Sequence, residues 1–414
     1  MAGHGLLPLL ISAGILLGAN GLIGTLIAVR ASLEGFPEAA IGLMGTAYFA
    51  GFFGGSLLTP KLIARAGHVR VFAALAALSA IAALGFVLAL NIPAWIAFRV
   101  LTGFAFSGLS MVVESWLNER AASADRGRVL SLYRIVDLGA VTGSQFLLPV
   151  FGPGGFEIFA VAAILFAAAL IPISLSKATS PPPPAITRLQ PLWVWRLSPV
   201  AAAGCITLGL TNGAFRTVGP LYAGSMGLSV DQVALFMSLG IAGGALLQYP
   251  FGWLSDRTDR RFILLLATAG AAASSLYLAS TESSVNAVLL GGFLFGSFAL
   301  PLYSLSAAHA NDHAKPGEFI GLAAGLTLFY ALGASIGPLA SSLIIERFGA
   351  PSFFNYTCSL HGLFILFVLY RMTKRAAVPA ALRSRFVALL RTSPLIFRLS
   401  EAPKDGDTAA KARN

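Results

Sequence analysis

The sequence predicts an all-α membrane protein with twelve transmembrane helices in two pseudo-symmetric six-helix bundles. Three observations support this prediction. Of the 414 residues, 57% are hydrophobic and only 11% are charged, whereas about 25% of the residues of a soluble protein are charged. Apolar runs of about 20 residues, the length that crosses a bilayer as a helix, recur along the chain. Patterns in the first half recur in the second. We therefore expect lipid to cover much of the surface.

Each expected helix is an apolar run bounded by charged or turn-forming residues. The first run lacks the basic segment that precedes the apolar part of a cleavable signal peptide, so we interpret it as a retained helix. The fifth and sixth runs are separated only by the turn-forming sequence Gly152-Pro153-Gly154-Gly155. The expected spans are residues 6–29, 38–63, 69–90, 93–117, 128–152, 154–176, 198–222, 230–254, 260–280, 284–309, 316–345 and 352–373.

Lysine and arginine are concentrated in the segments after the even-numbered spans, and basic loops are typically cytoplasmic. The opposite loops contain only Arg30 and Arg347. This asymmetry predicts that both termini are cytoplasmic, and it explains the net charge of +11 without nucleic-acid binding. The basic loop residues are Arg65, Arg70, Arg120, Arg126, Arg128, Lys177, Arg188, Arg196, Arg257, Arg260, Arg261 and Lys315.

The chain divides into four segments. Pro181-Pro182-Pro183-Pro184 is a stiff, non-helical run that separates six spans from the next six. Residues 380–399 mix apolar side chains with arginines, which fits an interfacial amphipathic helix; a poorly ordered basic tail is the alternative. We expect an N-terminal six-helix bundle (1–176), a Pro-rich cytoplasmic linker (177–197), a C-terminal six-helix bundle (198–373) and a basic cytoplasmic tail (374–414).

The two halves share an internal repeat. Gly54-Gly55-Ser56-Leu57-Leu58 in span two corresponds to Gly243-Gly244-Ala245-Leu246-Leu247 in span eight. Leu138-Gly139-Ala140 in span five corresponds to Leu332-Gly333-Ala334 in span eleven, again at an offset of about 190 residues. Internal repeats of this kind build secondary transporters whose halves rock about a central site.

Three motifs resemble those of the major facilitator superfamily. Residues 252–261, Gly-Trp-Leu-Ser-Asp-Arg-Thr-Asp-Arg-Arg, resemble its loop signature, with Asp259 where a glycine is usual. Residues 99–103, Arg-Val-Leu-Thr-Gly, resemble its Arg-x-x-Gln-Gly motif, with Thr102 in the Gln position. Residues 333–338 resemble its Gly-x-x-x-Gly-Pro motif, although they lie in span eleven instead of span five. The resemblance extends over about residues 6–373 and implies that Arg99 faces a central cavity.

A second set of motifs resembles a YcaD-like, uncharacterised bacterial branch of this superfamily. It comprises Glu114-Ser115-Trp116-Leu117-Asn118-Glu119-Arg120, Gln248-Tyr249-Pro250 and Ala310-Asn311-Asp312. The resemblance implies a major facilitator fold, a location in the bacterial inner membrane and transport by alternating access. It does not indicate the substrate or the direction of transport.

Ionisable residues inside a membrane are costly and therefore suggest function. Arg99, Arg134 and Arg216 predict a positive cavity that binds an anionic headgroup, with Asp137 as a partner of Arg134 on the same helix face. The alternatives are a fixed structural Arg134–Asp137 pair, an Arg99 satisfied by backbone carbonyls and an Arg216 that reaches outward to the headgroups. The uncharged candidates for the substrate path, each of which could instead bond neighbouring helices, are Asn20, Gln145, Asn212, Gln248, Tyr303 and Tyr330.

Proton coupling would need a buried acid, and Asp137 and then Glu114 are the candidates. A uniporter or an anion exchanger is equally open. Charges at the ends of the even-numbered spans are candidates for a cytoplasmic latch that breaks as that side opens, or simply for setting topology. The latch candidates are Asp256, Arg257, Arg260, Arg261, Asp312, Glu114, Arg65 and Arg70.

The sequence contains no phosphate-binding loop, metal-ligand spacing or catalytic constellation, so we predict no enzyme activity, no metal and no cofactor. We predict a monomeric secondary transporter whose partners are a small anionic or amphipathic solute and the lipid bilayer, with no nucleic acid. Two alternatives are a multidrug efflux protein and a non-transporting membrane scaffold or assembly factor. The scaffold predicts a filled centre.

Overall fold

The computed structural model describes residues 6–121, 126–175, 181–182, 189–282, 284–315, 318–379, 383–384 and 386–389. The regular structure in these ranges is helical, without strands. Ten helical segments among them are long and apolar enough to cross a membrane, and one bent helix pair makes eleven. Large apolar side chains point outward from several of them, as at Ile164 and Leu366, so the outer surface suits lipid.

The first half of the chain forms eight helices that make up the first six predicted spans. They are α1 (Leu7–Leu33), α2 (Glu38–Ala66), α3 (His68–Leu88), α4 (Ile92–Arg120), α5 (Arg126–Gln145), α6 (Leu147–Phe151), α7 (Glu157–Ala168) and α8 (Leu170–Ser174).

The second half repeats the arrangement with one irregular helix. Its elements are α9 (Pro191–Leu197), α10 (Pro199–Leu208), the π-helical turn η1 (Gly209–Gly213), α11 (Ala214–Ser225), α12 (Val230–Arg257), α13 (Arg260–Ser280), α14 (Val285–Ala299), α15 (Leu302–Asn311), α16 (Phe319–Phe348) and α17 (Ser352–Lys374).

Local chemistry explains several helix ends. Ser229 and Gln232 form a reciprocal capping box at the start of α12. The Asn91 side chain accepts a hydrogen bond from the Ala94 N–H and caps α4. Gly67, with φ of 81°, separates α2 from α3, because glycine enters this conformation without a steric penalty.

Two predicted elements differ from the structure. The fifth span, 128–152, is divided into α5 and α6 at Phe146, and α5 is the least apolar of the long helices. The linker was predicted to extend to residue 197, but Pro191–Leu197 form α9, bent by 115° from the helix that follows. Proline at the first helical position favours this start. Residues 183–188 of the linker lie outside the described ranges.

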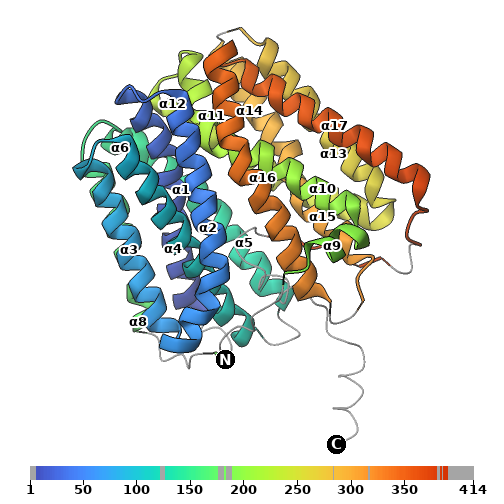
Figure 1. The fold of residues 1–414 in the computed structure, drawn as a ribbon, viewed down its shortest axis with the longest axis horizontal. Coiled ribbons are helices and arrows are strands. Elements are labelled where there is room, and N and C mark those ends of the chain that lie inside the picture. The colour runs from blue at the N-terminus through green and yellow to red at the C-terminus, as the bar shows by residue number, and fades with distance from the viewer. Residues whose placement is uncertain are drawn as a thin grey trace, which may run out of the picture.

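The two halves lie side by side. In Figure 1 the blue-to-teal helices of the first half gather on the left, and α16 stands beside α2 at the boundary. Contacts also join α1 to α11 and α5 to α12. We refer to the end of the bundle that holds the basic loops as the predicted cytoplasmic end, and to the other as the predicted periplasmic end.

The halves close tightly toward the predicted periplasmic end. A methyl group added at Gly42 in α2 would lie 2.6 Å from the Pro338 carbonyl oxygen of α16, too near for any side chain. Thr46 donates a hydrogen bond of 2.6 Å to the Ser335 carbonyl. Glycine thus lets α2 and α16 approach at backbone distance.

The described part of the tail packs against the second half. Residues 383–384 and 386–389 are not helical, and the Leu389 side chain is 3% exposed. For these residues the structure therefore replaces the predicted interfacial helix with an irregular segment bound to protein. The rest of that prediction, residues 380–382, 385 and 390–399, lies outside the described ranges.

Candidate functional site

Two adjoining hollows lie between the halves, with about 690 Å³ and about 570 Å³ of empty space. Both are lined by Arg134, Asp137, Val141 and Arg216. The fold therefore places Arg134, Asp137 and Arg216 where the two bundles meet. Of the eight predicted substrate-binding residues, seven line these hollows: Asn20, Arg134, Asp137, Gln145, Asn212, Arg216 and Tyr330.

Arg134 and Asp137 form an ion pair inside the cavity. The guanidinium Nη1 lies 2.7 Å from a carboxylate oxygen, and each side chain is about one-seventh exposed. One helical turn separates the two residues on α5, which gives them one face. Arg134 Nη2 also donates to Gln248 Oε1 across the interface at 3.1 Å, and Gln248 Nε2 donates to Ser304 Oγ at 2.8 Å. The pair thus connects the two halves.

Arg216 lies in α11 and has a different environment. Its side chain lines both hollows and is exposed there. Within the described part of the chain it makes no hydrogen bond or ion pair. The alternative interpretation, in which this arginine reaches outward to the headgroups, does not match a side chain that lines the cavity.

Arg99 does not line either hollow. Its guanidinium carbon lies 4.4 Å from the centre of the Tyr48 ring, and its Nε donates to the Met44 carbonyl at 3.3 Å. Tyr48 lines the second hollow and donates to Asn20 Oδ1 at 3.0 Å. The expectation that Arg99 faces the cavity is therefore replaced by an indirect position, in which Arg99 supports a tyrosine that does.

The polar uncharged candidates differ in how many of their hydrogen-bonding groups have a partner. Gln145 accepts a hydrogen bond of 2.6 Å from Thr25 Oγ1 and donates to the Val141 carbonyl. Asn212 lies in η1, and its buried amide Nδ2 has no hydrogen-bond partner among the described residues. A π-helical turn inside an α-helix is frequent at functional sites. Asn212 is therefore the polar group that most clearly lacks a structural explanation.

Sequence reasoning missed the aromatic wall of the second hollow. The set is Tyr48, Phe49, Phe52 and Phe106, which face Tyr330. Phe49 meets the Tyr330 ring edge-to-face at 6.3 Å across the interface. The spacing of residues 48, 49 and 52 gives one helix face, but in a membrane helix an aromatic face can equally meet lipid.

The latch candidates of the second half come together around Arg260. This buried guanidinium lies 2.7 Å from Asp312 and 3.2 Å from Asp256. Arg261 pairs with Asp259 instead, and Arg257 stacks on the Trp253 ring at 3.8 Å. Burial raises the pKa of the Asp259 carboxyl, but its bonds to Arg261 outweigh this and hold the pKa below the ordinary value. These ion pairs all lie within the second half.

The latch candidates of the first half are not brought together in the same way. Glu114 is fully buried and accepts a hydrogen bond of 3.3 Å from the Tyr133 hydroxyl. Arg65 and Arg70 are exposed. Among the described residues, no three His, Cys, Asp or Glu side chains are grouped so that they could hold a metal ion.

Comparison with known proteins places these features in a family. Residues 9–244 and 200–400 match the family model described as Major Facilitator Superfamily. An uncharacterised MFS-type transporter of Yersinia pestis is 26% identical over 383 residues, covering 89% of this chain and 98% of the relative. The uncharacterised MFS-type transporter YcaD of Escherichia fergusonii is 24% identical, covering 90% and 97% of the two chains.

Solved structures share the fold at low sequence identity. The nucleoside transporter NupG superposes with a TM-score of 0.75 at 14% identity, covering 90% of this chain and 100% of that one. A bacterial homologue of the human lysosomal transporter Spinster, in an inward-facing and occupied conformation, gives 0.76 at 13% identity, with 91% and 97% covered.

Proposed function

The chain belongs to the major facilitator superfamily, as a multi-pass secondary transporter of the YcaD-like branch, and we propose that it moves a small anionic or amphipathic solute by alternating access. The observation that carries the proposal is Arg216. Its charge lies in the cavity between the halves, with no acidic partner in the described part of the chain. A cation in this setting is costly unless an anion joins it.

The balance of charge in the cavity favours an anion over a cation. Asp137 neutralises Arg134 through their ion pair, which leaves Arg216 in excess. Arg99 adds a further positive charge behind Tyr48. A cationic drug would need an uncompensated acid here, and the cavity acid is already paired.

The aromatic wall favours a ligand with an apolar part. Phe49, Phe52 and Phe106 line the hollow that also contains Arg216. Aromatic rings stack on planar groups or pack on hydrocarbon, so one ligand can satisfy both the charge and the wall. An open centre of this kind also argues against the scaffold alternative.

Because the predicted periplasmic end is closed, this conformation supports access to the cavity from the cytoplasm, one state of an alternating-access cycle. The approach of Gly42 to Pro338 closes that end, while a hydrogen bond between Arg134 and Gln248 also joins the halves. We propose that the protein lies in the inner membrane with both termini cytoplasmic. The Arg260 cluster then holds the cytoplasmic end of the second half together as the halves rock.

We propose Asp137 as the coupling acid if transport is proton-driven. Protonation would break its ion pair with Arg134 and so free that guanidinium for the substrate. Glu114 is the second choice, since it is buried beside Tyr133 and away from both hollows.

A thermal-unfolding screen of metabolite anions on the purified protein tests the proposal. A ligand raises the unfolding midpoint because it binds the folded state. We expect an anion with an apolar part to stabilise the wild type and to lose at least tenfold in affinity with Arg216→Gln. Arg347→Gln is the control, because Arg347 is an exposed arginine in the last turn of α16 and does not line the cavity. A shift that survives Arg216→Gln unchanged would reject the site.

A further inference from the structure

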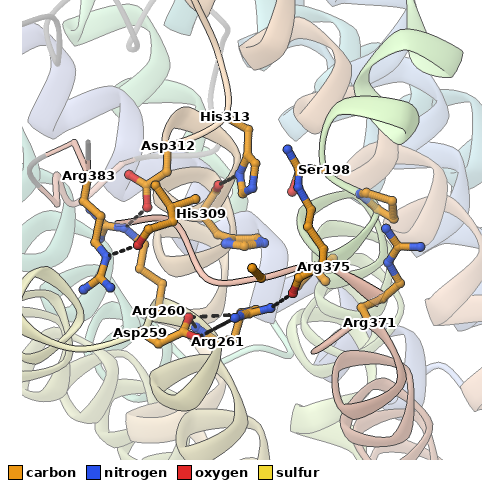
Figure 2. Close-up of a pocket in the computed structure, with 14 residues that line it drawn as sticks. Ser198, Asp259, Arg260, Arg261, His309, Asp312, His313, Arg371, Arg375 and Arg383 are labelled. Atoms are coloured by element: carbon orange, nitrogen blue, oxygen red, sulfur yellow. Dashed lines mark hydrogen bonds and ion pairs between the residues drawn. The ribbon is translucent and has the colours of Figure 1, made fainter. Parts of the chain in front are cut away.

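A second pocket lies at the predicted cytoplasmic end of the second half, apart from the cavity between the halves. It is bounded by the starts of α10 and α13, the ends of α15 and α17 and the first tail residues (Figure 2). It shares no lining residue with the two hollows of the central cavity. Apart from the ion pairs of the Arg260 cluster, the transport mechanism therefore does not account for it.

The pocket has an excess of positive charge. Five arginines line it, against Asp259 and Asp312. Asp312 is paired with Arg260 and Asp259 with Arg261, each at 2.7 Å. The arginines that remain, Arg371, Arg375 and Arg383, have no acidic partner among the described residues.

Within the described ranges, these three arginine side chains bond either to neutral backbone carbonyls or to no group. Arg375 Nη1 donates to the Leu197 carbonyl at 2.9 Å, and Arg383 Nε donates to the Val378 carbonyl at 3.0 Å. The Arg371 side chain makes no hydrogen bond with a described residue. Burial and the nearby charges of Arg371 and Arg261 lower the pKa of Arg375, which indicates crowding of like charges.

A buried polar side chain also faces this pocket. His309 is 8% exposed and lines the pocket, and its ring meets His313 edge-on at 4.9 Å. Its ring nitrogens have no hydrogen-bond partner in the described part of the chain. Figure 2 shows His309 between Asp312 and Arg375, with Arg371 at the same opening. Because it lines the pocket, this ring can bond a ligand that enters there.

We propose that this pocket binds a phosphate group, either in the headgroup of an anionic phospholipid or in a soluble phosphate ester. Guanidinium groups bind phosphate oxygens through paired, charge-assisted hydrogen bonds. The starts and ends of spanning helices lie at the depth of the lipid headgroups, where basic pockets bind anionic lipids. The ligand would bridge α17 and the tail to α10, α13 and α15.

Thermal unfolding of the full chain in neutral detergent tests this proposal with three probes. They are short-chain phosphatidylglycerol, glycerol phosphate and short-chain diacylglycerol, which lacks phosphate. The variants are the double substitution Arg371→Gln with Arg375→Gln, and the single substitution His309→Gln in case the double variant does not fold. Arg347→Gln is the matched control, because this exposed arginine lies at the opposite end of the bundle.

We expect a phosphate-bearing probe to raise the unfolding midpoint of the wild type and of Arg347→Gln. The double variant should weaken its apparent affinity at least tenfold, or about 1.4 kcal/mol, and His309→Gln should weaken it in the same direction. An effect of phosphatidylglycerol alone identifies a lipid headgroup, and an effect of glycerol phosphate as well identifies phosphate in general. The proposal is overturned if diacylglycerol acts equally, if neither phosphate probe acts, or if the folded pocket variants respond like Arg347→Gln.

Discussion

Arg134 and Arg216 are both arginines inside a predicted span, yet their surroundings differ. Arg134 has Asp137 one turn away and Gln248 across the interface. Arg216 has only the cavity before it in the described structure. Because a charge inside the membrane is costly without a counter-charge, the substrate is the group expected to complete the Arg216 site.

The Asp137→Asn substitution tests the assignment of the coupling acid. The neutral amide cannot exchange a proton, so solute flux should continue down its own gradient but lose its dependence on an imposed pH gradient. Flux and internal pH in proteoliposomes measure this. Glu114→Gln should keep the coupling, and the opposite pattern would transfer the role to Glu114.

The Arg260→Gln substitution should strongly destabilise the second half. Arg260 and Asp312 are 1% and 2% exposed, so the change leaves a buried carboxylate without its cation. Loss of one partner of a buried pair costs about 3–5 kcal/mol. Arg257→Gln should cost about 1 kcal/mol or less, because its stacking on Trp253 is exposed. Chemical denaturation compares the two, and equal effects would contradict a dominant role for Arg260.

At the scale of elements, the approach of α2 to α16 depends on small residues. Gly42 faces the Pro338 carbonyl, whereas Gly54 in the same helix has open space where a side chain would begin. The two glycines therefore differ in what a methyl group would meet, although they lie in the same helix. Of these two glycines, only Gly42 can control closure of the predicted periplasmic end.

Gly42→Ala should favour a state open at the predicted periplasmic end. The added methyl group meets the α16 backbone, which cannot move aside as a flexible side chain could. A cysteine at Thr217, buried near Gly45 at this contact, reports opening through its labelling rate. The background replaces Cys205 and Cys358 with alanine. Gly54→Ala is the control, and labelling equal to that of the control would show that the seal does not depend on Gly42.

The tail is bound by backbone N–H groups that donate to two acids, the buried Asp312 and the partly exposed Asp256. The Phe386 N–H donates to Asp256 and the Ser384 N–H to Asp312, each at 2.8 Å. The Leu389 N–H donates to Ser304 Oγ at 3.0 Å, and Ser304 in turn accepts from Gln248. The tail is thus connected to Arg134 by a chain of three hydrogen bonds, through Ser304 and Gln248.

Truncation before residue 383 should therefore lower the unfolding midpoint of the second half. It removes three backbone donors, two of them from the buried acceptors Asp312 and Ser304, and each buried acceptor left unsatisfied costs about 1–3 kcal/mol. Truncation after Leu389 keeps all of these contacts and is the control. A midpoint equal in the two truncated proteins would indicate that the tail contributes no stability.

At the scale of the whole molecule, orientation follows from the distribution of charge. A cysteine at Arg347 should react with an impermeant reagent added outside intact cells, since Arg347 lies at the predicted periplasmic end of α16. A cysteine at Arg257 should react only after the membrane is permeabilised. The reverse pattern would invert the topology.

Much of the fold could be predicted from the sequence because the bilayer imposes length and apolarity on each span. Span nine, predicted at 260–280, is α13 at the same residues, and the spans at 38–63 and 352–373 begin where α2 and α17 begin. The motifs likewise predicted the family that the comparisons confirm. The Arg134–Asp137 pair was predictable because three residues along a helix return to one face.

Other features depend on contacts between segments that are distant in the sequence. The sequence of a single helix does not show which of its faces meets which neighbour. The position of Arg99 behind Tyr48 depends on how α4 meets α2, and the aromatic wall depends on which face of α2 turns inward. The π-helical turn at Asn212 and the bound tail follow from packing and buried acceptors. The sequence by itself determined where the chain crosses the membrane, because burial in lipid acts on each segment separately. Tertiary structure alone decided which charges meet and which remain open to a ligand, because those interactions join segments far apart in the chain.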